Sequence, residues 1–186
     1  MVHVPLPEDS ELSEEIRATL ASIPPFNVFR MIANTPASFR GFTDLASSIL
    51  LRSQFDPKKR EIAVLRTAHV TKSLYEWTQH VRIARNLGVT DAEIEAAQAD
   101  GPVSALDEEG NMLCRVADEI SRDVRLSDEA LEWALSRYGV RQACELILCC
   151  SYFNMLSRFL ESTRVQLEDA DLVGGATPGQ IAKDAP

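Results

Sequence analysis

Apolar residues recur at three- and four-residue intervals along most of the chain, whereas the alternation of β-branched and polar residues that marks strands is missing. This pattern predicts an all-α protein. Proline, glycine and capping residues divide the pattern into segments. The predicted helices cover residues 10–23, 26–34, 36–55, 57–71, 73–88, 107–124, 127–138 and 141–165, with a further short helix after Thr90.

Capping signals support several of these helix boundaries. Asp56 followed by Pro57 is typical of an N-cap and a first helical residue. Ser73 is a predicted N-cap with Glu76 as a capping-box partner, and Thr90 begins a second signature of this kind. Gly139 is predicted to separate the last two helices.

The domain organisation follows from the same breaks. Residues 1–170 are predicted to form one helical domain, and the break at Gly101-Pro102 is interpreted as a seam inside it. Residues 171–186 contain Gly174-Gly175 and a polar end, which predicts a flexible tail.

Charge and composition restrict the partners. Nineteen Lys and Arg against 28 Asp and Glu give a net charge of -9 and a pI near 4.9, which disfavours nucleic acid. The N-terminus lacks a basic and apolar leader, and no apolar run approaches the roughly 20 residues of a membrane span, so a cytoplasmic protein without a membrane partner is expected. Cys114, Cys144, Cys149 and Cys150 have no Cys-x-x-Cys spacing and are interpreted as buried, reduced thiols.

Candidate chemistry concentrates between Glu61 and His80. Ser73, Glu76 and His80 are three and four positions apart, so they share one stripe of a helix. A carboxylate beside an imidazole raises its pKa and fixes its tautomer, which suits a proton-transfer group. Glu61 and His69 on the preceding helix could border the same pocket. A Glu-x-x-x-His pair alone is equally typical of a hydrogen bond on a helix surface.

A family resemblance adds to this pattern. The segments Arg60 to His69, Ser73 to His80 and Ala84 to Ile94 resemble the carboxymuconolactone decarboxylase and AhpD-like superfamily, most strongly over residues 57–100. The resemblance implies an AhpD-like helical bundle that associates as a homo-oligomer, a dimer, trimer or hexamer.

This chain departs from the redox motif of the superfamily. Peroxidase members carry a glutamate, eleven residues, a cysteine, two residues, a second cysteine, three residues and a histidine. Counted from Glu61, this sequence has Ser73 and Glu76 at the two cysteine positions and His80 in register. Neither replacement can be oxidised and recycled, so cysteine-dependent peroxidase activity is not expected. The resemblance then points to the decarboxylase branch, in which Glu76 and His80 match its Glu-x-x-x-His pair.

The leading hypothesis is a small-molecule acid-base enzyme, a decarboxylase-like lyase acting on a lactone or a carbonyl or carboxylate compound, without cofactor or metal. The predicted catalytic residues are His80, which protonates carbon, Glu76, which orients His80, and Glu61, a second carboxyl group. The predicted substrate-binding residues are Tyr75, His69, Ser73 and Trp77. Arg52 and Arg66 are interpreted as solvated helix residues rather than as partners of an acidic substrate.

Two other classes remain open. Glu61, His69, Glu76 and His80 could hold zinc or iron, although no His-x-x-x-His pair is present. Alternatively, the chain could be an AhpD-like protein of the peroxidase (peroxiredoxin) type that lacks the redox cysteines, or a non-catalytic oligomeric ligand-binding protein. Its apolar helix face would then bury against another copy. That face carries Phe39, Phe42, Leu45 and Ile49.

Overall fold

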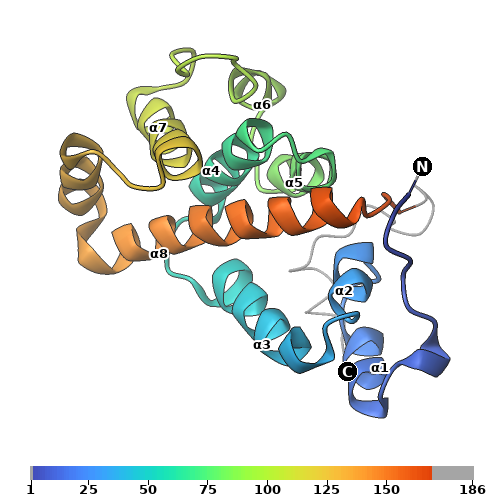
Figure 1. Ribbon diagram of the computed structural model, residues 1–186. Helices are drawn as coiled ribbons and strands as arrows, with labels where there is room; N and C mark the ends of the chain where they lie inside the picture. The colour runs from blue at the N-terminus through green and yellow to red at the C-terminus, as the bar shows by residue number, and fades with distance from the viewer. Residues whose placement is uncertain (1, 169–186) are drawn as a thin grey trace. The chain divides into compact units, whose positions relative to one another are not determined.

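The computed structural model describes residues 2–168, and every regular element in this range is helical (Figure 1). The all-α prediction is confirmed. The predicted tail, residues 171–186, lies outside the described residues. The helices are η1 (Asp9–Glu11), α1 (Glu14–Ser22), α2 (Asn27–Ile32), α3 (Pro36–Ser47), the π-helical η2 (Ser48–Arg52), α4 (Pro57–Val70), α5 (Leu74–Asn86), α6 (Asp91–Ala96), α7 (Glu108–Asp123) and α8 (Asp128–Thr163).

The chain divides into two compact units. One contains the residues up to Arg52 together with those from Ser162 onward, and the other is Ser53–Glu161. In the first unit, α1 and α2 both pack on α3. The N-terminal segment is held to this unit by bonds from Val4 N to Thr163 O and from Asn34 Nδ2 to Pro5 O, both 3.0 Å. All predicted site residues lie in the second unit, so the remaining description concerns Ser53–Glu161.

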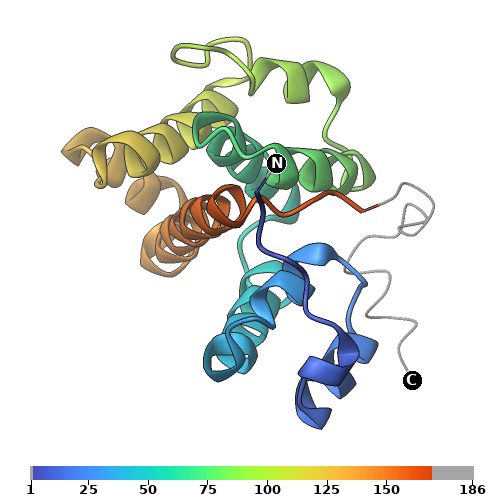
Figure 2. The ribbon, with the colours of Figure 1, turned by 45° about the vertical axis from the view of Figure 1, so that its right-hand side comes forward.

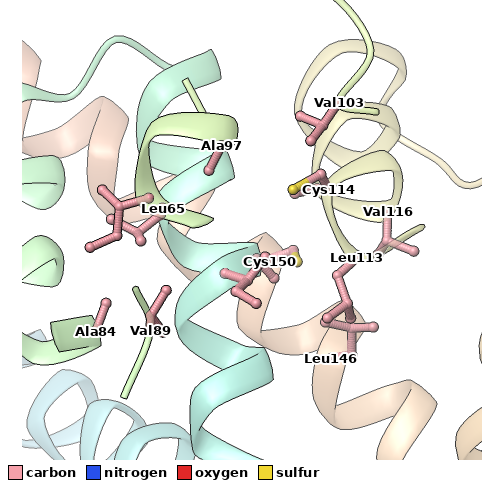
Figure 3. Close-up of a cluster of buried hydrophobic side chains, with 14 of the residues drawn as sticks. Leu65, Ala84, Val89, Ala97, Val103, Leu113, Cys114, Val116, Leu146 and Cys150 are labelled. Carbon is pink, nitrogen blue, oxygen red and sulfur yellow. The ribbon is translucent and has the colours of Figure 1, made fainter. Parts of the chain in front are cut away.

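Helix α4 is the centre of the second unit. It begins as predicted, with Asp56 as N-cap accepting a hydrogen bond from Lys59 N at 2.9 Å and Pro57 as its first residue. Every residue from Arg60 to Ala68 is buried, because α5, α6 and α7 all pack on this helix. Residues of α4, α7 and α8 meet in one apolar cluster, where Figure 3 shows Leu65, Leu113 and Leu146. This packing leaves the polar residues of α4 little access to solvent.

The boundaries of α5 and α6 follow their caps. Ser73 Oγ accepts from Glu76 N at 3.5 Å, so Ser73 is the N-cap of α5. The capping box expected there does not form within this helix, and one forms instead at α6 between Thr90 and Glu93. Gly88 follows α5 with φ +82°, a conformation that glycine adopts without strain.

The two helices predicted at the end of the chain are the two arms of α8. Gly139 interrupts them with φ 71° and ψ 171°. By length and composition α8 is the one helix of residues 2–168 that could cross a membrane, but 56% of its apolar window is buried within the protein, as is common for a core helix.

Arg66 corrects an expectation from the sequence, because its side chain is fully buried rather than solvated. It donates to both oxygens of Asp118, at 2.7 and 2.9 Å. It also donates to the carbonyl oxygens of Ala97, Ala99 and Gly101, at 3.1, 2.6 and 2.7 Å. The guanidinium therefore fixes the segment between α6 and α7, where the sequence showed only a break.

Candidate acid-base site

Helices α4, α5 and α8 bring four side chains together inside the second unit. Glu61 comes from α4, Glu76 and His80 from α5, and Phe153 from α8. Both ribbon views show α8 running alongside α4 and α5 (Figures 1 and 2). Glu61 is completely buried, and Glu76 and His80 are 3% and 5% exposed. These are not solvated surface groups, so the pair of Glu76 and His80 is not a helix-surface hydrogen bond.

The shortest polar contact of the site joins Glu61 to His80. Glu61 Oε2 lies 2.6 Å from His80 Nδ1. The other oxygen, Glu61 Oε1, accepts from Arg60 Nε at 3.1 Å and from Arg60 Nη2 at 3.0 Å. An ionised carboxylate only accepts hydrogen bonds, so His80 carries a proton on Nδ1.

The pKa values of this pair move apart. Burial by itself would raise the pKa of Glu61, but the charge and hydrogen bond of His80 and the charge of Arg60 outweigh it and lower that pKa. Burial would lower the pKa of His80, and the carboxylates of Glu61 and Glu76 outweigh it and raise that pKa. Glu61 is therefore held as a carboxylate next to an imidazole that binds a proton readily.

Glu76 faces the other side of the imidazole. Its Oε2 lies 3.5 Å from His80 Nε2. Burial is the main reason that the pKa of Glu76 rises to about 7, and the nearby Glu61 and Glu161 add to the rise. Near neutral pH, Glu76 is thus divided between its acid and carboxylate forms. The sequence assigned the orientation of His80 to Glu76, whereas in the structure Glu61 makes the orienting bond.

Helix α8 closes the site with aromatic side chains. The ring of Phe153 stands edge-on to the His80 ring, with 4.7 Å between centroids, and Tyr152 contacts Phe153 at 5.1 Å. Arg60 had no predicted role, although it directly precedes Glu61. The only sequence signal for Arg60 is a charged residue among the buried positions of an apolar helix.

The predicted substrate-binding residues do not all join this site. His69 is half-buried at the end of α4, its ring lies 6.3 Å from that of Trp77, and it bonds the backbone of Ala99. Trp77 packs on the apolar core cluster. Ser73 is buried as the cap of α5, and Tyr75 is buried one position before Glu76, about 100° around the helix from it.

The geometry does not support the metal alternative. Within residues 2–168 no group of three or more His, Cys, Asp and Glu side chains is arranged to hold a metal ion. A surface cavity of about 270 Å³ is lined by Lys58, Lys59, Ile62 and residues around α6 and the start of α7, not by Glu61 or His80.

Fold and site together define a helical protein with a buried carboxylate, imidazole and carboxyl group in a row. Residues 36–117 match the carboxymuconolactone decarboxylase family, and this span includes Glu61, Ser73, Glu76 and His80. Over this span the chain is similar to that family, and it carries Ser73 and Glu76 where the AhpD-like redox motif would place its two cysteines.

Solved structures show the same fold. An alkylhydroperoxidase AhpD core, a peroxidase-related protein from Ralstonia eutropha JMP134, is 19% identical with a TM-score of 0.77, over 95% of this chain and 97% of that one. A peroxidase-related protein from Silicibacter sp. TM1040 is 20% identical with a TM-score of 0.74, over 93% of each chain. Among curated proteins, none matches the sequence.

Proposed function

We propose that the chain is an acid-base enzyme that transfers a proton on a small lactone or carbonyl compound, with decarboxylation as the simplest reaction of this class. The observation that carries the proposal is the buried row of Glu61, His80 and Glu76, joined at 2.6 and 3.5 Å. Buried titratable groups whose pKa values are shifted by burial and by specific charged partners are typical of acid-base sites.

Each residue has a distinct role in this mechanism. Glu61 accepts from Nδ1 of His80 and so directs Nε2 toward the reacting carbon. When a substrate carboxylate leaves as carbon dioxide, its bonding electron pair stays on the carbon and is delocalised into the carbonyl group as an enolate. The proton held between His80 Nε2 and Glu76 is then delivered to that carbon. Solvent restores the proton to the pair, so no redox step is needed.

The test combines a substrate panel with matched variants. Carboxymuconolactone, other lactone carboxylates and β-keto acids are incubated with the protein in D2O, and carbon dioxide release and deuterium incorporation are followed. His80→Gln and Glu76→Gln should each lower turnover at least about 100-fold, the scale of general acid-base catalysis. His69→Gln is the control, because His69 lies apart from the site. Full turnover by His80→Gln would refute the assignment.

The similarity to peroxidase-related proteins favours a second candidate, a thiol peroxidase. Three of the four thiols argue against it; Cys144 is exposed, which corrects the expectation that all four cysteines are buried. Burial raises the pKa of Cys114 and Cys150 to about 12 and that of Cys149 well above its ordinary value, so these groups stay protonated and poorly nucleophilic. Hydroperoxide consumption with a dithiol that is abolished by Cys149→Ser would favour this candidate over proton transfer.

A third candidate is a non-catalytic oligomeric ligand-binding protein. It predicts no turnover on the panel together with small-molecule binding by calorimetry. Self-association as a dimer, trimer or hexamer belongs to both this candidate and the enzyme, and light scattering measures it. A monomer at working concentration would contradict the oligomer in either case.

A further inference from the structure

Arg60 has an unusual environment for an arginine. Its side chain is 7% exposed, beside the fully buried Glu61. Neighbouring residues of a helix point about 100° apart, so the long side chain must fold back to place Nε and Nη2 on Glu61 Oε1. Burying a guanidinium costs free energy unless it is paired with good geometry. Two nitrogens of the buried guanidinium thus act on one carboxylate oxygen of Glu61.

We propose that Arg60 is a positioning residue, whose guanidinium keeps Glu61 ionised so that His80 holds its proton on Nδ1 and presents an unprotonated Nε2 to Glu76. The catalytic meaning of this inference rests on the proposed function. The charge state and tautomer themselves do not, because they are properties of the resting protein.

The two carboxylate oxygens of Glu61 have different partners, and this explains how Arg60 affects His80. Oε1 is occupied by Arg60, and Oε2 faces His80 at 2.6 Å. Without the guanidinium, Oε1 loses both hydrogen bonds from Arg60 that offset burial, and Glu61 takes up a proton more readily. A protonated Glu61 can donate to Nδ1, which moves the imidazole proton to Nε2. Neutral His80 would then lose its acceptor on the side of Glu76, and Nε2 could no longer accept the proton of Glu76.

Several groups act on the Glu61 and His80 pair from the surrounding helices. From α4, Arg60 favours the deprotonated state of the pair. From α5, Glu76 favours the protonated state of His80. From α8, Cys149 lies close enough to interact electrostatically with Arg60 and Glu61. Tyr152 and Glu161, also on α8, both interact with Glu76. Loss of the Arg60 cation removes the positive charge that lowers the pKa of both groups, so the pKa of Glu61 and the pKa of His80 should rise.

The experiment measures the histidine ring directly in the full-length protein. Ring ¹⁵N chemical shifts of the three histidines are recorded against pH, with His3→Gln and His69→Gln used for assignment. Wild type should show His80 as the Nδ1-H tautomer in its neutral form. Arg60→Gln should raise the His80 titration midpoint by about one pH unit or more, or convert the ring to the Nε2-H tautomer. Arg60→Lys keeps the charge and should shift the midpoint less than half as far.

Lys59→Gln is the matched control, because Lys59 is the neighbouring cation and binds Glu109 instead, at 2.8 Å. It should leave His80 unchanged. An unchanged tautomer and midpoint in Arg60→Gln would overturn the inference. If Arg60→Gln does not fold by circular dichroism, the wild-type spectrum decides the question, since a neutral His80 ring with its proton on Nε2 would also overturn the inference. Because no substrate is used, failure of every substrate in the panel would sink the proposed function and leave this result standing.

Discussion

Replacing Glu76 by Gln should make the protein more stable and less active. Burial raises the pKa of Glu76 from 4.5 to about 7. Between these pH values the unfolded chain loses the proton while the native protein keeps it, so the free energy of unfolding falls as pH rises. At about 1.4 kcal/mol per unit, roughly 3 kcal/mol of stability is present below pH 4.5 and lost by about pH 7. Gln cannot ionise and avoids this loss.

Urea unfolding at pH 5, 6, 7 and 8 measures the effect. Glu76→Gln should match wild type within about 1 kcal/mol at pH 5 and exceed it by up to about 3 kcal/mol at pH 8. Glu93→Gln is a control of opposite sign, because hydrogen bonds from Thr90 and Lys58 outweigh burial and lower the pKa of Glu93. That variant should be less stable at neutral pH, with the difference shrinking as pH falls. A Glu76→Gln protein that is less stable than wild type at pH 8 would refute the reasoning.

Three further predictions concern stability and thiol reactivity. Arg66→Met should cost about 3–5 kcal/mol of unfolding free energy in urea, because it removes the buried partner of Asp118 and the donor to three carbonyl oxygens. Arg85→Met should cost about 0–1 kcal/mol because the Arg85 pair with Asp91 is exposed, and equal losses would contradict this. Ser157→Ala should leave the melting temperature unchanged or raise it, since the buried hydroxyl of Ser157 has no hydrogen-bond partner among the described residues. A decrease in unfolding free energy above about 1 kcal/mol would be inconsistent with that environment. A colorimetric thiol reagent should quickly modify one cysteine in the native chain, the exposed Cys144, and all four cysteines after denaturation. A second cysteine that reacts quickly in the native protein would show that the core opens readily.

The sequence determined the helices and most of their ends. Asp56-Pro57, Thr90 with Glu93, and Gly139 all act through backbone groups within a few residues, so their effect does not depend on the rest of the fold. Helical periodicity likewise placed Glu76 and His80 on one face, and the structure holds them 3.5 Å apart. The prediction that Ser73 is an N-cap is confirmed, but the side chain of Glu76 contacts His80 and does not complete a capping box.

The tertiary structure decided what each charged side chain does. Glu61 and His80 are 19 residues apart, and only the packing of α4 against α5 brings them to 2.6 Å. Arg60 and Arg66 lie on the same helix, and nothing in the sequence distinguishes their roles. Arg60 donates to Glu61, whereas Arg66 donates to Asp118 and to three carbonyl oxygens. Helical periodicity predicts which residues share a face but not which neighbouring helix that face meets. The partner, and with it the pKa and the chemistry of each group, depends on that contact.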